Sequence, residues 1–475
     1  MELLFESRLE ITRIYGRLRT VQHQPQIMPE PVVSPTHSTD AGGCTIYGTV
    51  LHDGGRYRMW YQAWPKDRDG RKNALVAYAE SDNGLDWQKP TLNLVDRGGL
   101  DNNLCDLGFA SPSVFIDPHA EADFRYRAVG CCAAQYMGAH PHATSRGYYT
   151  AHSADGLHWT LDSTSPTWKG TDVVTSIYHP ARRGGLVAMK YYPRACGFGR
   201  RAIWTATMDG REYSVPSTAL VPDDFDDVAA LARGFASGDY YGMGMLPAGK
   251  ATVGFLWQFR HQLPRTEGGM RDGRGIFGIV DVSLAYQPSP GECWMHQAGR
   301  PDFLSHGTTS WSKGGLYTAS NPIEVGDEHW LYITGSAQSH GWYLDAEWKN
   351  IPERQQHLID NAHSRIGIAH WPKWRLFGFQ ADPQGELDID LGVIAEPVEL
   401  VLNYQTEVGG SIRVRISSNA DLNETNAVAM TGDSIGETVA WKNGTIIPPA
   451  DDKPVVARLF LDRASVWAYE LRPVR

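Results

Sequence analysis

The sequence contains one phrase that occurs twice in nearly the same form. Residues 76–90 read VAYAESDNGLDWQKP, and residues 148–160 read YYTAHSADGLHWT. In both copies a β-rich run leads into an Asn-Gly or Asp-Gly pair, which is a strong signal for a tight turn, and a Trp follows the Gly. Internal repeats of this kind indicate a fold assembled from similar sheets, and they constrain the architecture more than any other feature.

Three weaker copies extend the pattern along the chain. They are Gly291-x-x-Trp294, Gly210-x-x-Tyr213 and a degraded version within residues 365–374. Each copy is paired with a predicted β-hairpin, and the five hairpin turns lie near residues 53, 120, 182, 248 and 326. A hairpin followed by two further strands makes a four-stranded sheet. Five such sheets in succession predict an all-β chain with a five-bladed β-propeller, a ring that leaves only short sheet edges exposed.

The repeat ends after about residue 385. The strands beyond it alternate apolar and polar residues between Gly, Asn and Asp turns, which predicts a small C-terminal antiparallel β-sandwich. We therefore expect a propeller over residues 1–385, with an N-terminal extension at 1–36, and a sandwich domain over 386–475. Two helical insertions are predicted, at residues 223–236 and 346–363, and the second could cap the propeller funnel.

Charge and composition exclude several classes of partner. The 475 residues include 54 acidic and 44 basic side chains, for a formal net charge of −10. This excess disfavours nucleic acid and anionic membranes as partners and fits a neutral ligand. No apolar run is long enough to cross a bilayer, and the N-terminus lacks the apolar segment of a signal peptide, so we expect a cytoplasmic protein. The six cysteines show no disulfide spacing and are expected to be reduced and buried.

No sequence pattern points to a metal or a cofactor. His140-Pro-His142 has no second spaced pair to complete a zinc site. The Gly-rich residues 268–275 lack the Gly-Lys-Ser/Thr of a phosphate loop, although the arginines between Arg260 and Arg274 could meet an anionic ligand. Neither a nucleophile elbow nor a dinucleotide fingerprint occurs. We expect an enzyme that needs no cofactor.

Four acidic residues recur with the period of the blades. Asp40, Asp106, Asp172 and Asp239 are separated by 66, 66 and 67 residues, and each stands where the first strand of a blade is predicted to start. A propeller gathers these strand starts around one funnel, where crowded carboxyl groups shift each other's pKa values apart. Glycoside hydrolysis needs such a pair, one acid and one ionised base or nucleophile. We expect Asp40 to be the base or nucleophile and Asp172 the general acid, with Asp239 or Asp106 orienting the substrate.

The alternative is that these aspartates only make local hydrogen bonds, which aspartate commonly does in turns and at strand starts. Aromatic and histidine side chains near the first strands are candidates for substrate binding. Trp257, Trp311 and Tyr240 could stack on a sugar ring, and His37 and His340 could hydrogen-bond its hydroxyl groups. With 16 Trp in the chain, packing between blades is the competing explanation for the tryptophans.

Several stretches resemble the invertase, levansucrase and arabinanase superfamily of five-bladed glycoside hydrolases, and most closely bacterial proteins described as glycosyl hydrolase family 32-like. The matching stretches are YGTVLHDGGRYRMWYQAW, SDNGLDWQKP, PSVFIDP, HSADGLHWT, NPIEVGDEHWLYITGS and LVLNYQTEVGGSIRVRIS. Together they cover nearly the whole chain. The resemblance implies a propeller followed by a sandwich and an activity on glycosidic bonds, but these motifs are architectural and say less about chemistry.

The chain departs from that superfamily where the invertase catalytic acids stand. The first-blade segment is THSTDAGGCTIYG, in which Asp40 is the single acid, and Ser111 occupies the second-blade position. The third-blade segment GTDVVTSIYHP carries Asp172, while Glu292-Cys293 lies in a turn of the fourth blade. The invertase triad therefore does not transfer, and fructosidase specificity is not implied.

The sequence thus predicts a glycoside hydrolase acting on a small glycoside or oligosaccharide through carboxylates in the propeller funnel. Three alternatives stay open: a glycoside phosphorylase of the same fold, a non-catalytic carbohydrate-binding propeller, and a sialidase-like protein. The last is less favoured because no clear arginine triad occurs. The expected partner is a small carbohydrate, and assembly into a homo-oligomer is left open.

Overall fold

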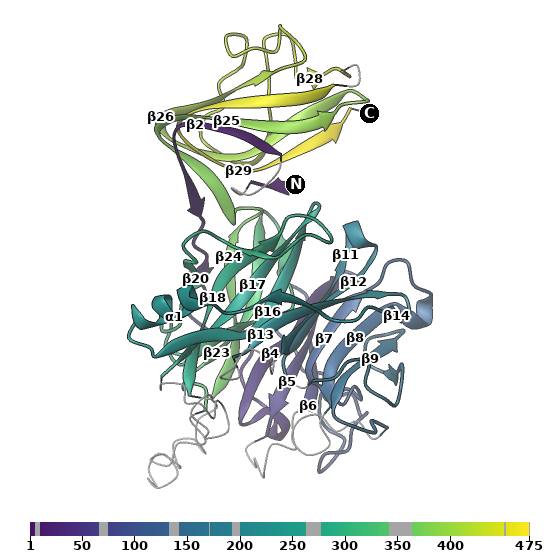
Figure 1. Cartoon of the computed structure of the whole chain (residues 1–475). Helices are drawn as coiled ribbons and strands as arrows, with labels where there is room; N and C mark the ends of the chain where they lie inside the picture. Colours follow the sequence, from purple (N-terminus) through teal and green to yellow (C-terminus); the bar gives the residue numbers. More distant parts are fainter. Residues whose placement is uncertain are drawn as a thin grey trace.

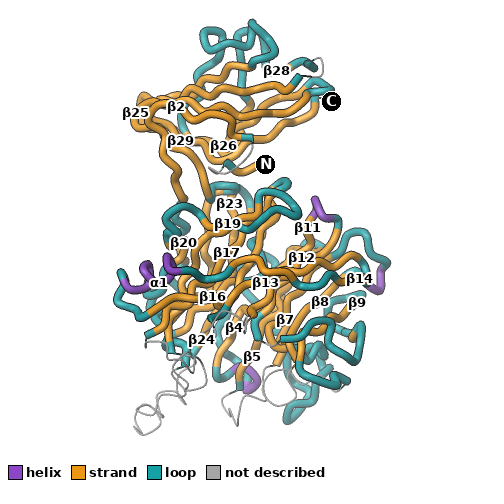
Figure 2. The backbone as a smooth tube through the Cα atoms, viewed as in Figure 1, coloured by secondary structure: helices purple, strands orange, loops and turns teal. Residues whose placement is uncertain are grey.

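The computed structural model describes residues 1–4, 10–65, 75–132, 142–170, 172–191, 200–262, 277–341, 363–450 and 453–474. These residues form two lobes, both built of β-strands (Figure 1). Helix is confined, in this part of the chain, to α1 (Asp224–Leu231) and to three single turns of 3₁₀ helix, η1 (Ser38–Asp40), η2 (Ala122–Phe124) and η3 (Pro180–Arg182) (Figure 2). No helix among the described residues is long and apolar enough to cross a membrane.

The larger lobe is a five-bladed β-propeller, as the repeat predicts. Blade 1 contains β4 (Gly43–Asp53), β5 (Arg56–Trp64) and β6 (Leu75–Ser81). Blade 2 contains β7 (Ala110–Ile116), β8 (Tyr126–Cys132), β9 (Gly147–Ser153) and β10 (Thr160–Leu161). Blade 3 contains β11 (Val174–His179), β12 (Gly184–Tyr191), β13 (Ala202–Asp209), β14 (Glu212–Tyr213) and β15 (Ser217–Leu220).

The last two blades complete the ring. Blade 4 contains β16 (Ser237–Ala248), β17 (Ala251–His261), β18 (Gly278–Gln287), β19 (Met295–His296) and β20 (Asp302–Leu304). Blade 5 contains β21 (Gly315–Thr318), β22 (Ile323–Val325), β23 (Glu328–Ser336), β24 (Ser364–Pro372) and, from the N-terminal region, β3 (Gln26–Ile27). All pairings within the blades are antiparallel.

The repeated phrase connects one blade to the next. In both strong copies the glycine has a positive φ, 76° at Gly84 and 80° at Gly156, which the tight turn requires. The Gly84 carbonyl accepts a hydrogen bond from the Tyr332 hydroxyl of blade 5, and the Gly156 carbonyl accepts one from Trp60 Nε1 of blade 1, both at 2.7 Å. The repetition is therefore structural, because each copy binds its blade to the preceding one.

The smaller lobe is the predicted β-sandwich. Its seven-stranded sheet has the order β2 (Ile11–Gln22), β25 (Phe377–Val393), β29 (Pro454–Pro473), β26 (Val398–Ile416) and β27 (Asp433–Thr438). Two short strands join it, β1 (Glu2–Leu3) on β29 and β28 (Ile446–Ile447) on β26. The long strands shift register midway, for instance between Thr406 and Ser411. Side chains from both sides of that shift, such as Leu402 and Val414, enter one buried core, so the sheet folds over on itself.

The N-terminal segment runs through both lobes. Strands β1 and β2 belong to the sandwich sheet, and β3 then adds an outer strand to blade 5. The predicted boundary at residue 385 lies inside β25, and β2 lies within the predicted N-terminal extension, so the sandwich sheet takes strands from both ends of the chain. The turn after β16 packs against Glu2 of the sandwich sheet, so the end of β16 faces the sandwich. The start of β16, together with the starts of the other innermost strands, therefore lies at the propeller end remote from the sandwich (Figure 1).

The helical prediction at residues 223–236 is confirmed by α1. Asp223 caps the helix, because its side chain accepts hydrogen bonds from the N–H groups of Phe225 and Asp226. The prediction at residues 346–363 lies outside the described residues except for His363.

Candidate active site

The innermost strands meet on the propeller axis through hydroxyl groups. Ser113 Oγ of blade 2 lies 2.6 Å from Ser320 Oγ of blade 5, and the Thr49 hydroxyl of blade 1 donates to Ser320 Oγ at 3.1 Å. From blade 3 the Ser176 N–H donates to Ser113 Oγ at 2.6 Å. All four side chains are buried. These contacts join blades 1, 2, 3 and 5 around the axis, and we expect a pocket that opens at the strand starts to end at this hydroxyl layer.

A layer of tyrosines lies next to the hydroxyl groups, on the side of the strand starts. Tyr47 lies where the pairing of β4 with β5 shifts register, between Thr45 and Thr49. Its ring packs edge-on against Tyr317 with centroids 5.2 Å apart, and Tyr241 packs on Tyr317 at 5.5 Å. Tyr47 is partly exposed, whereas the other two are buried.

The phenols of Tyr47 and Tyr241 keep their protons at neutral pH. Burial raises the pKa of Tyr47 and of Tyr241 well above the usual value, and the negative charge of Asp172 adds to the effect on both. Protonated phenols are hydrogen-bond donors as well as apolar surfaces. The layer can therefore contact both the faces and the hydroxyl groups of a sugar ring.

Asp172 lies beside this layer in an ion pair with Lys190. The carboxylate and Nζ are 2.6 Å apart, and the side chains are 26% and 1% exposed, respectively. The Lys190 ammonium also lies 3.5 Å from the centre of the Tyr241 ring, a cation–π contact. Solvent thus reaches the carboxylate but not the lysine that holds it. Among the four predicted acids, Asp172 has this combination of an axial position and an accessible carboxylate.

The backbone is strained at two neighbouring positions around this carboxylate. Asp172 has φ 132° and Ser111 has φ 52°, values that residues other than glycine rarely adopt. Cys131 connects the two positions, because it pairs with the residue before Ser111 and its thiol is hydrogen-bonded by the Asp172 backbone. Strained residues of this kind concentrate at binding and catalytic sites.

A buried amide completes this part of the site. Gln62 Oε1 accepts a hydrogen bond from the Ser111 N–H at 3.2 Å, so the Nε2 group must face the other way. Nε2 is buried and has no protein partner. A buried donor without a partner costs about 1–3 kcal/mol, and folded proteins rarely keep one unless water or a ligand satisfies it.

Asp239 also lies near Tyr241, and it is buried in contacts with Arg201 and His261. Arg201 Nη1 is 3.2 Å from each of its carboxylate oxygens, and His261 Nε2 is 3.2 Å away. Burial favours the neutral acid, but the Arg201 and His261 charges outweigh it and lower the pKa of Asp239. Arg201 also lies over the Tyr241 ring, 5.6 Å from its centre. The structure therefore brings Asp172 and Asp239 together around one tyrosine, with one accessible and the other enclosed.

Asp40 lies in η1, just before β4 of blade 1, and its side chain is enclosed by the protein. Its carboxylate accepts from Lys89 Nζ at 2.5 Å, from Tyr61 Oη at 3.0 Å and from the His37 N–H at 2.9 Å, and its side chain is not exposed. Burial would raise the pKa of Asp40, but Lys89 and these hydrogen bonds lower it overall. This saturated carboxylate has the contacts of a structural residue.

Asp106 faces the second copy of the repeated phrase. Its carboxylate accepts a hydrogen bond from the Trp159 N–H at 2.8 Å, and burial raises the pKa of its side chain. The charged neighbours that influence it are His158 and Asp155, at the turn that follows β9. None of these contacts joins it to Asp172, Asp239 or Asp40.

Two of the five predicted substrate-binding residues adjoin the tyrosine layer. Trp257 stacks on Tyr47, with centroids 5.8 Å apart, and His340 Nε2 lies 2.9 Å from the Tyr241 hydroxyl. The other three have different surroundings. The Tyr240 hydroxyl donates to Asp226, Trp311 Nε1 donates to the Pro29 carbonyl, and His37 precedes η1 beside Asp40.

The residues missed by the sequence analysis are Lys190, Arg201, Tyr47, Tyr241 and Tyr317. A signal for Lys190 was present, because a lysine inside the apolar strand LVAMKYY must be paired or exposed. Tyr241 had no such signal. The β16–β17 pairing shifts register between Tyr240 and Gly242, so a bulge, rather than simple alternation, turns Tyr241 towards the axis.

The described groups considered for a metal or an anionic ligand lie outside the tyrosine layer. No cluster of three His, Cys, Asp or Glu suited to a metal ion occurs among the residues that the structure describes. Arg260, one of the arginines considered for an anionic ligand, is buried in ion pairs with Asp281 and Asp302. The remaining arginines of that segment lie outside the described residues.

Sequence comparisons find little. No family model matches the chain. Two uncharacterized proteins of Mycobacterium tuberculosis are similar over a short region: MT1551 (strain CDC 1551 / Oshkosh) is 32% identical over 117 residues and Rv1502 (strain ATCC 25618 / H37Rv) is 30% identical over 118 residues. Each match covers 24% of this chain and 32% of the relative, so the similarity spans about a third of these relatives.

Similar solved structures include three carbohydrate-related proteins. An N-acetylgalactosamine deacetylase from F. plautii, in complex with blood group B trisaccharide, is 15% identical with TM-score 0.44 and covers 74% of this chain and 96% of its own. A glycosyl hydrolase from Bacteroides ovatus is 14% identical with TM-score 0.45, covering 74% and 94%. A Bombyx mori GH32 beta-fructofuranosidase is 10% identical with TM-score 0.42, covering 94% and 95%. Likenesses this weak carry no information on activity.

Proposed function

We propose that the protein hydrolyses a small glycoside or oligosaccharide in a pocket at the strand-start end of the propeller axis. The observation that supports this most directly is the partly exposed Asp172 carboxylate, held by a buried lysine beside a layer of tyrosines. Aromatic surfaces combined with a few polar groups are typical of sites for small ligands. The closed hydroxyl layer beneath favours a dead-end pocket over a through channel.

The neighbours of Asp172 favour the ionised role in this reaction. Its carboxylate lies 2.6 Å from the Lys190 ammonium, in an ion pair. Asp172 therefore fits the base or nucleophile of glycoside hydrolysis better than the general acid expected from the sequence. The phenols of Tyr47 and Tyr241 and the unpaired Nε2 of Gln62 would serve as donors to substrate hydroxyl groups.

A second candidate is a carbohydrate-binding propeller without catalysis. One observation favours it: Asp40 and Asp239, two of the other strand-start acids, are each enclosed by cations. Hydrolysis needs a second carboxyl group within reach of the scissile bond, and neither of these is presented to a ligand. The tyrosine layer alone would be enough to bind a sugar.

The decisive experiment is turnover of a broad panel of aryl glycosides and short oligosaccharides, with and without inorganic phosphate, together with calorimetric binding of the same sugars. Hydrolysis independent of phosphate, abolished in Asp172→Asn without loss of sugar binding, is the expected result. Turnover that requires phosphate would replace hydrolysis with phosphorolysis. Binding without any turnover would establish the second candidate.

A matched control separates the site from general damage to the protein. Asp106→Asn changes an aspartate with the same position in the repeat whose contacts are with Trp159 and the turn after β9. It should leave turnover of the responsive glycoside unchanged. Equal loss of turnover in Asp106→Asn and Asp172→Asn would contradict the assignment of the site to the axis.

A further inference from the structure

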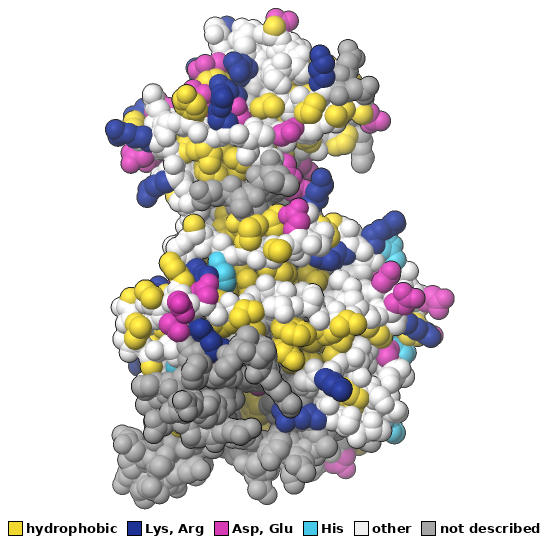
Figure 3. Space-filling view, viewed as in Figure 1, with side chains coloured by type: hydrophobic (Ala, Val, Ile, Leu, Met, Phe, Trp, Pro, Cys, Tyr) yellow, Lys and Arg dark blue, Asp and Glu magenta, His cyan; other side chains and the backbone are white. Residues whose placement is uncertain are grey.

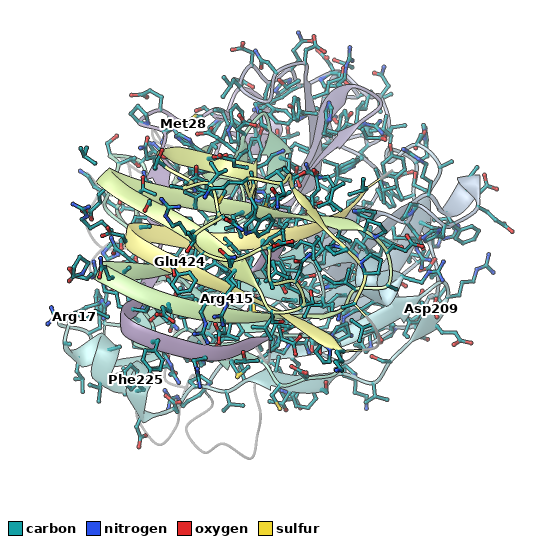
Figure 4. The ribbon with its side chains drawn as sticks, turned by 90° about the horizontal axis from the view of Figure 1, so that it is seen from above. Arg17, Met28, Asp209, Phe225, Arg415 and Glu424 are labelled. Atoms are coloured by element: carbon teal, nitrogen blue, oxygen red, sulfur yellow. The ribbon has the colours of Figure 1, made fainter. Side chains whose placement is uncertain are left out.

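The tyrosine layer lies towards the propeller end that is remote from the sandwich. Tyr47 and Tyr241 stand in the first halves of the innermost strands β4 and β16, nearer to the strand starts than to the strand ends. The opposite end faces the sandwich: Figure 4, seen from above, shows the sandwich strands over part of the propeller, and Figure 3 shows hydrophobic side chains where the two lobes meet. A group that assists Asp172 should therefore reach the layer from the strand-start end.

His340 reaches the tyrosine layer from this end. Its backbone forms an antiparallel bridge with Gly278, the first residue of β18. Because β16, β17 and β18 pair antiparallel in turn, the start of β18 is level with the start of β16. The imidazole ring packs edge-on against Tyr241 and Phe259, with ring centroids 5.0 and 5.2 Å away, and these two contacts fix its orientation.

The imidazole of His340 is connected to the surroundings of Asp172 through one phenol. Nε2 lies 2.9 Å from Tyr241 Oη. The centre of the same ring lies 3.5 Å from the Lys190 ammonium, which pairs with Asp172. His340 is partly exposed, whereas Tyr241 is buried. A single hydroxyl group therefore stands between a histidine that solvent reaches and the side of the pocket that holds the accessible carboxylate.

The charged groups near His340 offset one another. Among the described residues, five charged or titratable side chains surround the two rings on which it packs: Lys190, Arg201, Asp172, Asp239 and His261. Each of the two cations is paired with one of the two aspartates. Histidine can both gain and lose a proton in the pH range in which most enzymes work, so it is suited to move protons at such a place.

The other groups around Tyr241 are poorly suited to supply a proton. Burial would raise the pKa of Asp239, but Arg201 and His261 lower it overall, so this carboxylate holds no proton to give. Burial and the charge of Asp172 raise the pKa of Tyr241 itself. The phenol can therefore release its proton only if another proton reaches its oxygen in the same step, and His340 Nε2 is placed to deliver one.

We propose that His340 supplies, through the Tyr241 hydroxyl, the proton that the leaving group of the glycoside takes up. The Tyr241 O–H proton passes to the glycosidic oxygen while the imidazolium Nε2–H proton passes to Tyr241 Oη, so the phenol is neutral before and after the step. The bond between the anomeric carbon and the glycosidic oxygen breaks, and its electron pair stays on that oxygen. This inference rests on the proposed function and names the proton source that the enclosed aspartates do not provide.

The protons balance for either role of Asp172. If Asp172 acts as a base, it takes a proton from the attacking water, and solvent returns that proton to the imidazole. If Asp172 acts as a nucleophile, the neutral imidazole takes a proton, again through Tyr241, from the water that hydrolyses the glycosyl ester. One water molecule is consumed in both cases, and His340 ends each cycle protonated.

The dependence on the leaving group tests the proton transfer. For a sugar that the wild type hydrolyses, the dinitrophenyl glycoside departs without a proton, whereas the methyl glycoside needs one. His340→Gln should lower kcat/KM on the methyl glycoside by about 10²–10⁴-fold and on the dinitrophenyl glycoside by less than about fivefold. Turnover of the dinitrophenyl glycoside also shows that the variant is folded. Equal losses on both substrates would overturn this inference alone, and a wild type that hydrolyses neither would overturn the proposed function with it.

Two more variants and a pH profile separate proton transfer from a structural role. Tyr241→Phe removes the connecting hydroxyl and should show the same selective loss on the methyl glycoside. The wild-type kcat/KM on that substrate should fall as rising pH removes the imidazole proton, and His340→Gln should lack this alkaline fall. His370→Gln is the matched control, because His370 is 21% exposed and bonds Glu328 at 3.0 Å, and it should lower neither rate. A Tyr241→Phe protein that hydrolyses the methyl glycoside at the wild-type rate would refute the route through the phenol.

Discussion

Two aspartates at equivalent places in the repeat each pair with a lysine, and their surroundings are opposite. Asp40 precedes the innermost strand of blade 1 and lies 2.5 Å from Lys89, while Asp172 precedes that of blade 3 and lies 2.6 Å from Lys190. The first carboxylate is completely buried and the second is 26% exposed. Asp40 also accepts from a tyrosine and from backbone N–H groups, whereas Asp172 adjoins the tyrosine layer on the axis.

The difference shows that an aspartate that recurs with the blade period is not for that reason available to a ligand. All acceptor positions of Asp40 are used inside the protein, so it contributes to folding and offers nothing to a ligand. Asp172 has one buried partner and one accessible side, and its backbone conformation is strained. These features are expected where structure has been arranged for binding rather than for stability.

The largest expected effect separates the two aspartates by activity. Asp172→Asn should lower kcat/KM on the best glycoside of the panel by about 10²–10⁴-fold, because it removes the proposed base or nucleophile. Asp40→Asn should leave kcat/KM per folded molecule within about twofold. Steady-state kinetics on both variants checks this. Similar losses of kcat/KM in the two variants would mean that Asp40 and Asp172 do not differ in their roles.

The next effect separates the two lysines by stability. Lys89→Met leaves Asp40 buried without its cation, which should cost about 3–5 kcal/mol of unfolding free energy. Lys190→Met should cost less, because water reaches Asp172 and can solvate its charge. Chemical denaturation followed by tryptophan fluorescence measures both. Adding Asp40→Asn to Lys89→Met should recover part of the loss, and strictly additive losses would mean that the pair is not coupled.

The acid stability of the protein gives a smaller effect. The pKa of Asp40 is lowered from 3.8 in the folded protein, so the folded state binds its proton less readily than the unfolded state. Its contribution is therefore complete above pH 3.8 and is lost as the pH falls through the lower folded value. One such group gives a slope of at most about 1.4 kcal/mol per pH unit. Thermal melts between pH 5 and 3 should fall less steeply in Asp40→Asn, and identical slopes would contradict this.

The smallest effect concerns the strained backbone beside Asp172. Ser111→Gly should be more stable than Ser111→Ala by about 1 kcal/mol, because glycine adopts φ 52° without steric cost. Ser165 is an exposed loop serine without a positive φ, and there the order should reverse. Melting temperatures of the four variants provide the measurement. If Ser111→Ala is as stable as Ser111→Gly, the positive φ at position 111 does not destabilise the protein.

The comparison also shows where prediction from the sequence succeeded. The recurring turn glycines and hairpins predicted five blades and the sandwich, because turn chemistry and strand alternation are local properties. Trp257 and His340, named as candidates from the sequence, adjoin the tyrosine layer, and their role in substrate binding stays a prediction. The period of 66 or 67 residues also marked Asp172 and Asp239.

Prediction was weaker where partners come from elsewhere in the chain. Lys89, which encloses Asp40, is 49 residues away from it, and no local pattern connects the two. Tyr240 was named although Tyr241 faces the axis, because a bulge in β16 changes the alternation there. The N-terminal strand β2 gave no sign that it pairs with β25 in the C-terminal sheet.

The amino-acid sequence by itself determined the number of blades, their order and the aspartates that stand at the strand starts. It could do so because repeats, turns and strand alternation depend on residues close together in the chain. Only the tertiary structure decided which aspartate is enclosed and which is accessible, and which tyrosines gather on the axis. Burial and ion pairing depend on side chains that meet only when the blades close into a ring, and these same contacts separate the enclosed Asp40 from the accessible Asp172.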